Sequence, residues 1–150
     1  MDPVREPAEE ELARIVRHAS TVAVVGMKDD SRPFEPAHAI PRICRDLGMR
    51  ILPVNPTIES ALGVPSVDRL ASLSIPFDLV DVFRRSERIP ELAEEILALP
   101  PDRRPAVVWL QSGIRHDAAA ARLEDAGIRV VQDACLGVYA QRYRRRTLSR

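Results

Sequence analysis

Small and polar residues follow five short apolar runs of the chain, and their types suit the binding of phosphates. These residues are Gly26-Met27-Lys28-Asp29-Asp30-Ser31-Arg32, Asn55-Pro56, Arg84-Arg85-Ser86, Gln111-Ser112-Gly113 and Asp133-Ala134-Cys135. Glycine lets a phosphate approach the backbone closely, while lysine, arginine and serine supply charge and hydrogen bonds. We therefore expect an anion site if the fold brings these segments together. The residues alone fit a second interpretation equally well, in which Gly26 only makes a tight turn and the charged side chains point to water.

The apolar runs alternate with helical patterns along the chain. Residues 21–25 are β-branched and lack polar alternation, which is typical of a strand buried on both faces. Further strands are expected at 50–54, 78–83, 106–110 and 128–132, with a short one at 64–67. Helices are expected at 7–19, 36–47, 87–99 and 117–126, with a helical turn at 69–73 and a start or kink near Pro41. This order predicts an α/β fold, a doubly wound parallel β-sheet flanked by helices in a Rossmann-like arrangement.

In an open parallel sheet, ligands bind beyond the carboxyl ends of the strands, where the strand order reverses. The five polar segments all follow predicted strands, so they should meet at one edge. An NAD site requires G-x-G-x-x-G after the first strand and an acidic residue near the end of the second. Only Gly26 is present here, and the second strand ends in Pro53-Val54-Asn55-Pro56, which makes NAD a poor candidate. The pattern G-x-x-x-x-G-K-[ST] is absent, so ATP hydrolysis is not expected.

The bulk composition fits one domain over residues 1–150, with a core at about 19–137, an N-terminal helix at about 7–19 and a basic tail at about 140–150. The net charge of zero gives no reason to expect nucleic acid or an anionic membrane as a partner. Neither a membrane span nor a signal-peptide pattern is found, and the two cysteines form no disulfide or zinc pattern, so we expect a cytoplasmic location and no metal. The tail is expected to be a solvated, frayed terminus; its residues are Arg142, Tyr143, Arg144, Arg145, Arg146 and Arg150.

Several short motifs occur in a specific order along the chain. They are Val24-Val25-Gly26, Ser31-Arg32-Pro33, Ile40-Pro41, Gly48, Pro53-Val54-Asn55-Pro56, Val80-Asp81-Val82-Phe83-Arg84, Trp109-Leu110-Gln111-Ser112-Gly113 and Asp133-Ala134-Cys135. Over roughly residues 19–137 the chain resembles the small stand-alone CoA-binding domain family. That family is similar in fold to the CoA-binding domain of succinyl-CoA synthetase alpha subunits. The resemblance implies that coenzyme A, or an acyl-CoA, lies across the carboxyl edge of the sheet.

The resemblance also implies which residues contact the cofactor. The loop 26–32 would hold the nucleotide phosphates, Pro53 and Asn55 would border the adenosine, and the ends of the next strands would flank the rest. The implied cofactor-binding residues are Gly26, Met27, Lys28, Ser31, Arg32, Pro53, Asn55, Phe83, Arg84, Gln111, Ser112, Gly113 and Cys135. The chain departs from the family at Lys28, where a serine is frequent, and the Asp29-Asp30 pair brings negative charge towards a polyanion. This pair predicts weakened CoA binding.

No catalytic residue is predicted, because His116 has no nucleophile or acid partner in the sequence. In the related synthetase alpha subunit the phosphorylated histidine belongs to a second domain. Cys135 could form a mixed disulfide with CoA if positive charge stabilised its thiolate; otherwise it is a small packing residue. We therefore expect a sensor, carrier or regulatory module that binds a small-molecule nucleotide. The alternatives are a CoA-dependent thiol- or acyl-transfer enzyme using Cys135, and an interaction protein with a decayed nucleotide site; a protein partner is left open.

Overall fold

Five parallel strands form the centre of the computed structural model, which describes residues 5–144. They are β1 (Thr21–Val25), β2 (Arg50–Val54), β5 (Leu79–Val82), β6 (Val107–Leu110) and β7 (Arg129–Val131). Their order is β2-β1-β5-β6-β7, so the direction of winding reverses between β1 and β5. The predicted strands are confirmed, the first two to the residue and the other three with ends one or two residues shorter.

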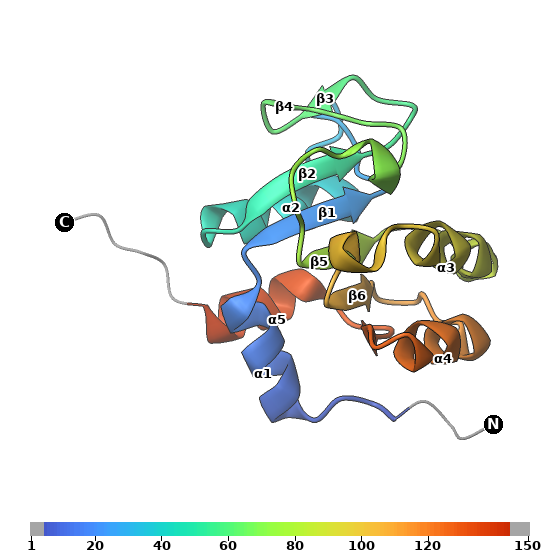
Figure 1. Cartoon of the computed structure of the whole chain (residues 1–150). Helices are drawn as coiled ribbons and strands as arrows, with labels where there is room; N and C mark the ends of the chain where they lie inside the picture. Colours follow the sequence, from blue (N-terminus) through green and yellow to red (C-terminus); the bar gives the residue numbers. More distant parts are fainter. Residues whose placement is uncertain (1–4, 145–150) are drawn as a thin grey trace.

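Helices cover both faces of this sheet (Figure 1). The helices α1 (Glu9–His18), α2 (Pro36–Asp46) and α5 (Leu136–Tyr143) pack on one face, and α3 (Ile89–Leu97) and α4 (Asp117–Asp125) pack on the other. Short 3-10 turns lie at Leu70–Ser72, Ser86–Arg88 and Pro101–Arg103. The predicted doubly wound α/β fold is thereby confirmed. Among residues 5–144, every helix is too short or too polar to cross a bilayer.

The expected strand at 64–67 takes a different form. Val64–Pro65 (β4) pairs with Ser60–Ala61 (β3) in a small antiparallel hairpin outside the main sheet. Val67 then makes an isolated parallel bridge to Val54, at the end of β2. The hairpin therefore folds back beside the carboxyl end of β2.

Two apolar clusters explain why the strands lack polar alternation. In β1, Ala23 and Val25 face α3 and α4, whereas Val22 and Val24 face α1, α2 and α5. Successive side chains of a strand point to opposite faces of the sheet. Because helices cover both faces, the side chains on both must be apolar, and the strand is a continuous apolar run. Trp109 is fully buried on the α5 side, where its indole N–H donates to the carbonyl of Ala134 at 2.8 Å.

Pro41 lies inside α2, which begins five residues earlier at Pro36. The predicted helix start at Pro41 is therefore wrong. Because proline has no N–H, the carbonyl of Ala37 four residues earlier has no helical partner. The backbone N–H of Lys28 donates to this carbonyl at 3.1 Å. The proline thus makes a carbonyl available that attaches the loop after β1 to α2.

The expectation of a frayed terminus is wrong for residues 142–144, because Arg142 and Tyr143 belong to α5 and Arg144 contacts the neighbouring helices. The guanidinium of Arg144 donates to the carbonyls of Val16 at 2.9 Å, Ala19 at 2.8 Å and Leu47 at 3.0 Å. These carbonyls lie at the ends of α1 and α2, where helices leave acceptors without partners. Arg145, Arg146 and Arg150 lie outside the described residues.

Candidate functional site

The strand order reverses where Gly26 follows β1 and Phe83 follows β5. Gly26 has a φ of +83°, in the left-handed region that favours glycine, and a Cβ at this position would lie 2.4 Å from the carbonyl oxygen of Phe83. Its N–H also donates to the carbonyl of Val54 at 2.9 Å, which continues the pairing with β2. Gly26 therefore joins three strand ends at the point where ligands of open parallel sheets bind.

The loop after Gly26 is held by its own polar groups. The carboxylate of Asp29 accepts hydrogen bonds from the N–H of Ser31 at 3.0 Å and from its hydroxyl at 2.5 Å. Arg32 pairs with Glu35 at 2.9 Å, and both side chains are exposed. Met27 is fully buried, so its side chain packs in the core beneath the loop. Of the predicted phosphate-binding residues, Lys28, Ser31 and Arg32 reach the surface of this loop.

Asn55 connects this loop to the end of β2. Its amide donates to the carbonyl of Met27 at 2.7 Å, and its side-chain oxygen accepts from the N–H of Thr57 at 2.9 Å and from its hydroxyl at 2.8 Å. Asn55 is only 9% exposed, and Pro53 is buried within β2. Proline is tolerated there because β2 is an edge strand. The side chain of Asn55 thus connects the loop after β1 with the segment after β2.

A cavity of about 400 Å³ opens between the loop after β1 and the segment after β2. Its lining residues are Asp29, Asp30, Ser31, Thr57, Ile58, Glu59 and Ser60. The carboxylate of Asp30 accepts from the N–H of Leu62 at 3.0 Å and contacts Nε2 of the buried His38 at 2.8 Å. The first of these bonds, aided by His38, holds the pKa of Asp30 below its usual range. Asp29 and Asp30 therefore remain beside the cavity as carboxylates.

The ends of β5 and β6 supply the other predicted positions. Phe83 and Arg84 are half-buried after β5, and Ser112 is exposed after β6. Gly113 has a φ of +82°, and its N–H donates to the carboxylate of Asp133 at 2.6 Å. These residues reach the same edge of the sheet as Gly26, because the strands that precede them are parallel.

Gln111 points into the protein and contacts a carboxyl group that sequence reasoning missed. Its amide donates to Asp81 at 2.5 Å, and its side-chain oxygen accepts from the N–H of Leu136 at 3.3 Å. Asp81 is fully buried, and its second oxygen has no hydrogen-bond partner among residues 5–144. Burial raises the pKa of Asp81 to about 7, although the bond from Gln111 works against this shift. The sequence reasoning treated Asp81 only as part of a motif, although its place within an apolar strand was the signal that could have indicated its burial.

Two cysteines and one histidine remain among the residues that the sequence singled out. Cys135 precedes α5 as a half-buried free thiol, and Cys44 is a buried free thiol whose pKa is raised by burial. His116 accepts a hydrogen bond from the N–H of Ala119 at 3.1 Å and so caps α4. Within residues 5–144, no group of three or more histidine, cysteine or acidic side chains is placed to hold a metal ion.

Comparisons with known proteins identify the family to which the chain belongs. A family model described as CoA binding domain matches residues 20–141. Protein YneT of Bacillus subtilis (strain 168) is 38% identical over 135 residues, which cover 90% of this chain and 96% of YneT. A Thermus thermophilus protein of solved structure is 40% identical with a TM-score of 0.82, over 91% of this chain and 99% of that one.

A larger enzyme contains the same fold. The dinucleotide-forming acetyl-coenzyme A synthetase 1 of Ca. Korarchaeum cryptofilum aligns over 79% of this chain and 27% of the synthetase, with a TM-score of 0.63. At 16% identity this similarity shows the fold alone. The family match and the two close relatives cover nearly the whole sheet and its carboxyl edge. The chain therefore belongs to the CoA-binding domain family.

Proposed function

We propose that the chain binds coenzyme A or an acyl-CoA at the carboxyl edge of its sheet, as a cytoplasmic sensor, carrier or regulatory module without catalysis of its own. The observation that carries this proposal is the reversal of the strand order between β1 and β5, because open parallel sheets bind their ligands at such a point and Gly26 lies there against the backbone of Phe83. Membership of the CoA-binding domain family supports CoA as the class of ligand.

Lys28 and Arg84 are the cations that we assign to the phosphates. Both are half-buried and follow the two strands that flank the reversal point, β1 and β5. Neither takes part in the ion pairs found among residues 5–144. A cation without a protein partner can give its full charge to a phosphate, and charge-assisted hydrogen bonds are about twice as strong as neutral ones.

One observation supports the alternative of a transferase that uses Cys135. The thiol lies at the N-terminus of α5, where the helix dipole favours a negatively charged group. The variant Cys135→Ser distinguishes the two functions. It should bind CoA as the wild type does if the chain is a binding module, whereas it should lose acyl or thiol transfer if Cys135 is the nucleophile.

A thermal-shift titration of the reduced protein with CoA, acetyl-CoA, NAD and ATP tests the proposal. A ligand specific for the native state stabilises it by about 2.7 kcal/mol at a hundredfold excess over its Kd. We expect Tm to rise with CoA or acetyl-CoA and to stay constant with NAD. A constant Tm at millimolar CoA would contradict CoA binding.

Arg84→Ala tests the assignment of the phosphates. Loss of a charged hydrogen bond of about 1.5–3 kcal/mol should raise the Kd for CoA about tenfold or more. Arg85→Ala is the matched control, because Arg85 is the next residue, carries the same charge and is exposed. Equal effects of the two variants would mean that only the overall charge of this edge matters.

A further inference from the structure

The cavity of about 400 Å³ lies between two loops that follow neighbouring strands, β1 and β2. In Rossmann-like nucleotide sites the ribose lies beside the end of the second strand. If CoA binds as proposed above, this cavity is the place for its adenosine ribose. The chemistry of the lining then decides which ribose is accepted.

The lining consists of three carboxylates, three hydroxyls and one apolar side chain, and it contains no lysine, arginine or histidine. Carboxylates accept hydrogen bonds from free ribose hydroxyls, whereas a phosphorylated ribose is generally held by arginine. The acidic residues alone would not define a site. Here they line a cavity that the strand order and the family already connect with a nucleotide.

The negative charges of this lining are fixed in place. Asp30 is held by Leu62 and His38, and Asp29 is held by Ser31. Hydrogen bonds from Ser31 to Asp29, and from Leu62 and then His38 to Asp30, keep the pKa of each carboxyl below its usual range. Neither group can therefore take up a proton easily when another anion approaches.

The cation that follows in the loop is already engaged. Arg32 pairs with Glu35, so its charge is largely compensated within the loop. A 3′-phosphate would bring between one and two negative charges against ionised carboxylates, and like charges at this range repel. A free 3′-hydroxyl would instead find acceptors.

We infer that this cavity accepts an unphosphorylated ribose and disfavours a 3′-phosphate, so that the chain prefers dephospho-CoA and its acyl derivatives to CoA. This inference rests on the proposed function, because it concerns the adenosine part of the same site. Asp29, Asp30 and Glu59 are the specificity-determining residues.

Isothermal titration of the reduced protein with CoA and with dephospho-CoA tests the inference, since the two ligands differ only in the 3′-phosphate. EDTA should be present so that no divalent cation bridges phosphate and carboxylate. We expect the Kd for dephospho-CoA to be lower by about tenfold or more. The preference should shrink as salt is raised, because screening weakens repulsion between exposed charges.

Glu59→Lys is the sharpest variant, because Glu59 is exposed and makes no side-chain hydrogen bond or ion pair found among residues 5–144. The ratio of the Kd for CoA to the Kd for dephospho-CoA should fall by about tenfold, because the lysine attracts the 3′-phosphate that the glutamate repels. Glu10→Lys on α1 is the matched control, with the same change in charge at an exposed position remote in sequence from the cavity. Its ratio should equal that of the wild type.

The outcomes separate the inference from the proposed function. If CoA binds at least as tightly as dephospho-CoA, or if Glu59→Lys leaves the ratio unchanged, the inference is overturned while CoA binding stands. If neither nucleotide binds, the proposed function fails, and the inference fails with it.

Discussion

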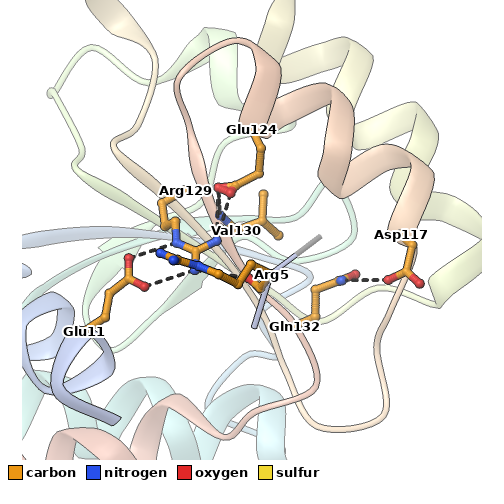
Figure 2. A network of polar contacts seen from close by, with 7 residues as sticks. All are labelled: Arg5, Glu11, Asp117, Glu124, Arg129, Val130 and Gln132. Carbon is orange, nitrogen blue, oxygen red and sulfur yellow. Dashed lines mark hydrogen bonds and ion pairs between the residues drawn. The ribbon is translucent and has the colours of Figure 1, made fainter. Parts of the chain in front are cut away.

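The two edges of the parallel sheet use charge in opposite ways. At the amino edge, Asp78 accepts from the N–H groups of Ser20 and Thr21 at 2.9 and 2.8 Å. Arg129, the first residue of β7, lies between Glu11 and Glu124 and donates to both (Figure 2). Arg144 donates hydrogen bonds to carbonyls at the end of α1, at the same edge. Each of these charges meets a partner within the chain.

The carboxyl edge leaves two of its cations without an ion pair among the described residues. Lys28 and Arg84 are absent from the ion pairs of residues 5–144, and the carboxylates of Asp29 and Asp30 line a cavity. The backbone itself takes a conformation that only glycine adopts easily. The difference indicates that the amino edge stabilises the fold, and it is consistent with the binding role that we propose for the carboxyl edge.

The largest effect on stability is expected at Gly26. In Gly26→Ala a new methyl group would overlap the carbonyl of Phe83, so we expect a loss of about 4 kcal/mol, from a positive φ of about 1–2 kcal/mol and overpacking of about 1–3 kcal/mol. Gly127→Ala is the control, since Gly127 has nearly the same φ, +84°, but open space around its Cβ. It should lose only about 1–2 kcal/mol in urea denaturation. Equal losses would show that the close approach to Phe83 is relieved without strain.

Asp81 should make stability depend on pH. The folded protein keeps the proton of Asp81 up to about pH 7, whereas the unfolded chain releases it near pH 4. Folding therefore binds a proton between these values, and the free energy of unfolding falls as the pH rises through this interval, in total by an amount on the order of 4 kcal/mol. Asp81→Asn should remove this slope, as measured by urea denaturation from pH 4 to pH 8. An unchanged slope would mean that Asp81 is not its source.

The sequence predicted the sheet well because buried parallel strands are simple apolar runs. It missed α5, since an eight-residue helix followed by arginines has little periodicity and is stabilised by contacts of Arg144 far away in the sequence. The sequence reasoning singled out Gly26 because it is a glycine directly after a predicted strand. It could not show that Asn55 and Gln111 bind other parts of the protein, because Met27 and Asp81 are brought to them by the fold.

Arg144→Ala tests the stabilising role of the amino edge. Loss of the guanidinium leaves carbonyls of α1 and α2 without their charged donor, and we expect a loss of about 2–3 kcal/mol. Arg142→Ala is the control, because Arg142 makes an exposed ion pair with Glu9 and should contribute much less to stability. Both variants should bind CoA as tightly as the wild type. Weaker binding by Arg144→Ala alone would show that the two edges are coupled.

The smallest expected effect is the difference in stability that two Glu–Arg ion pairs contribute, one at each edge. Glu11 pairs with Arg129 at the amino edge, where the two side chains are 23% and 20% exposed, while Glu35 pairs with Arg32 at the carboxyl edge, where they are 41% and 59% exposed. The bond from Arg129 lowers the pKa of Glu11, so its contribution is present at neutral pH and is lost as the pH falls through that lowered pKa.

Glu11→Gln should therefore reduce the free energy of unfolding by about 1 kcal/mol at pH 7, and Glu35→Gln should reduce it by less. Salt should weaken the exposed pair more than the half-buried one, because screening acts chiefly on charges in water. Urea denaturation at low and high salt measures both. Since Glu35→Gln releases Arg32, it should also lower the Kd for CoA. A larger loss of stability at Glu35 than at Glu11 would reverse the roles assigned to the two edges.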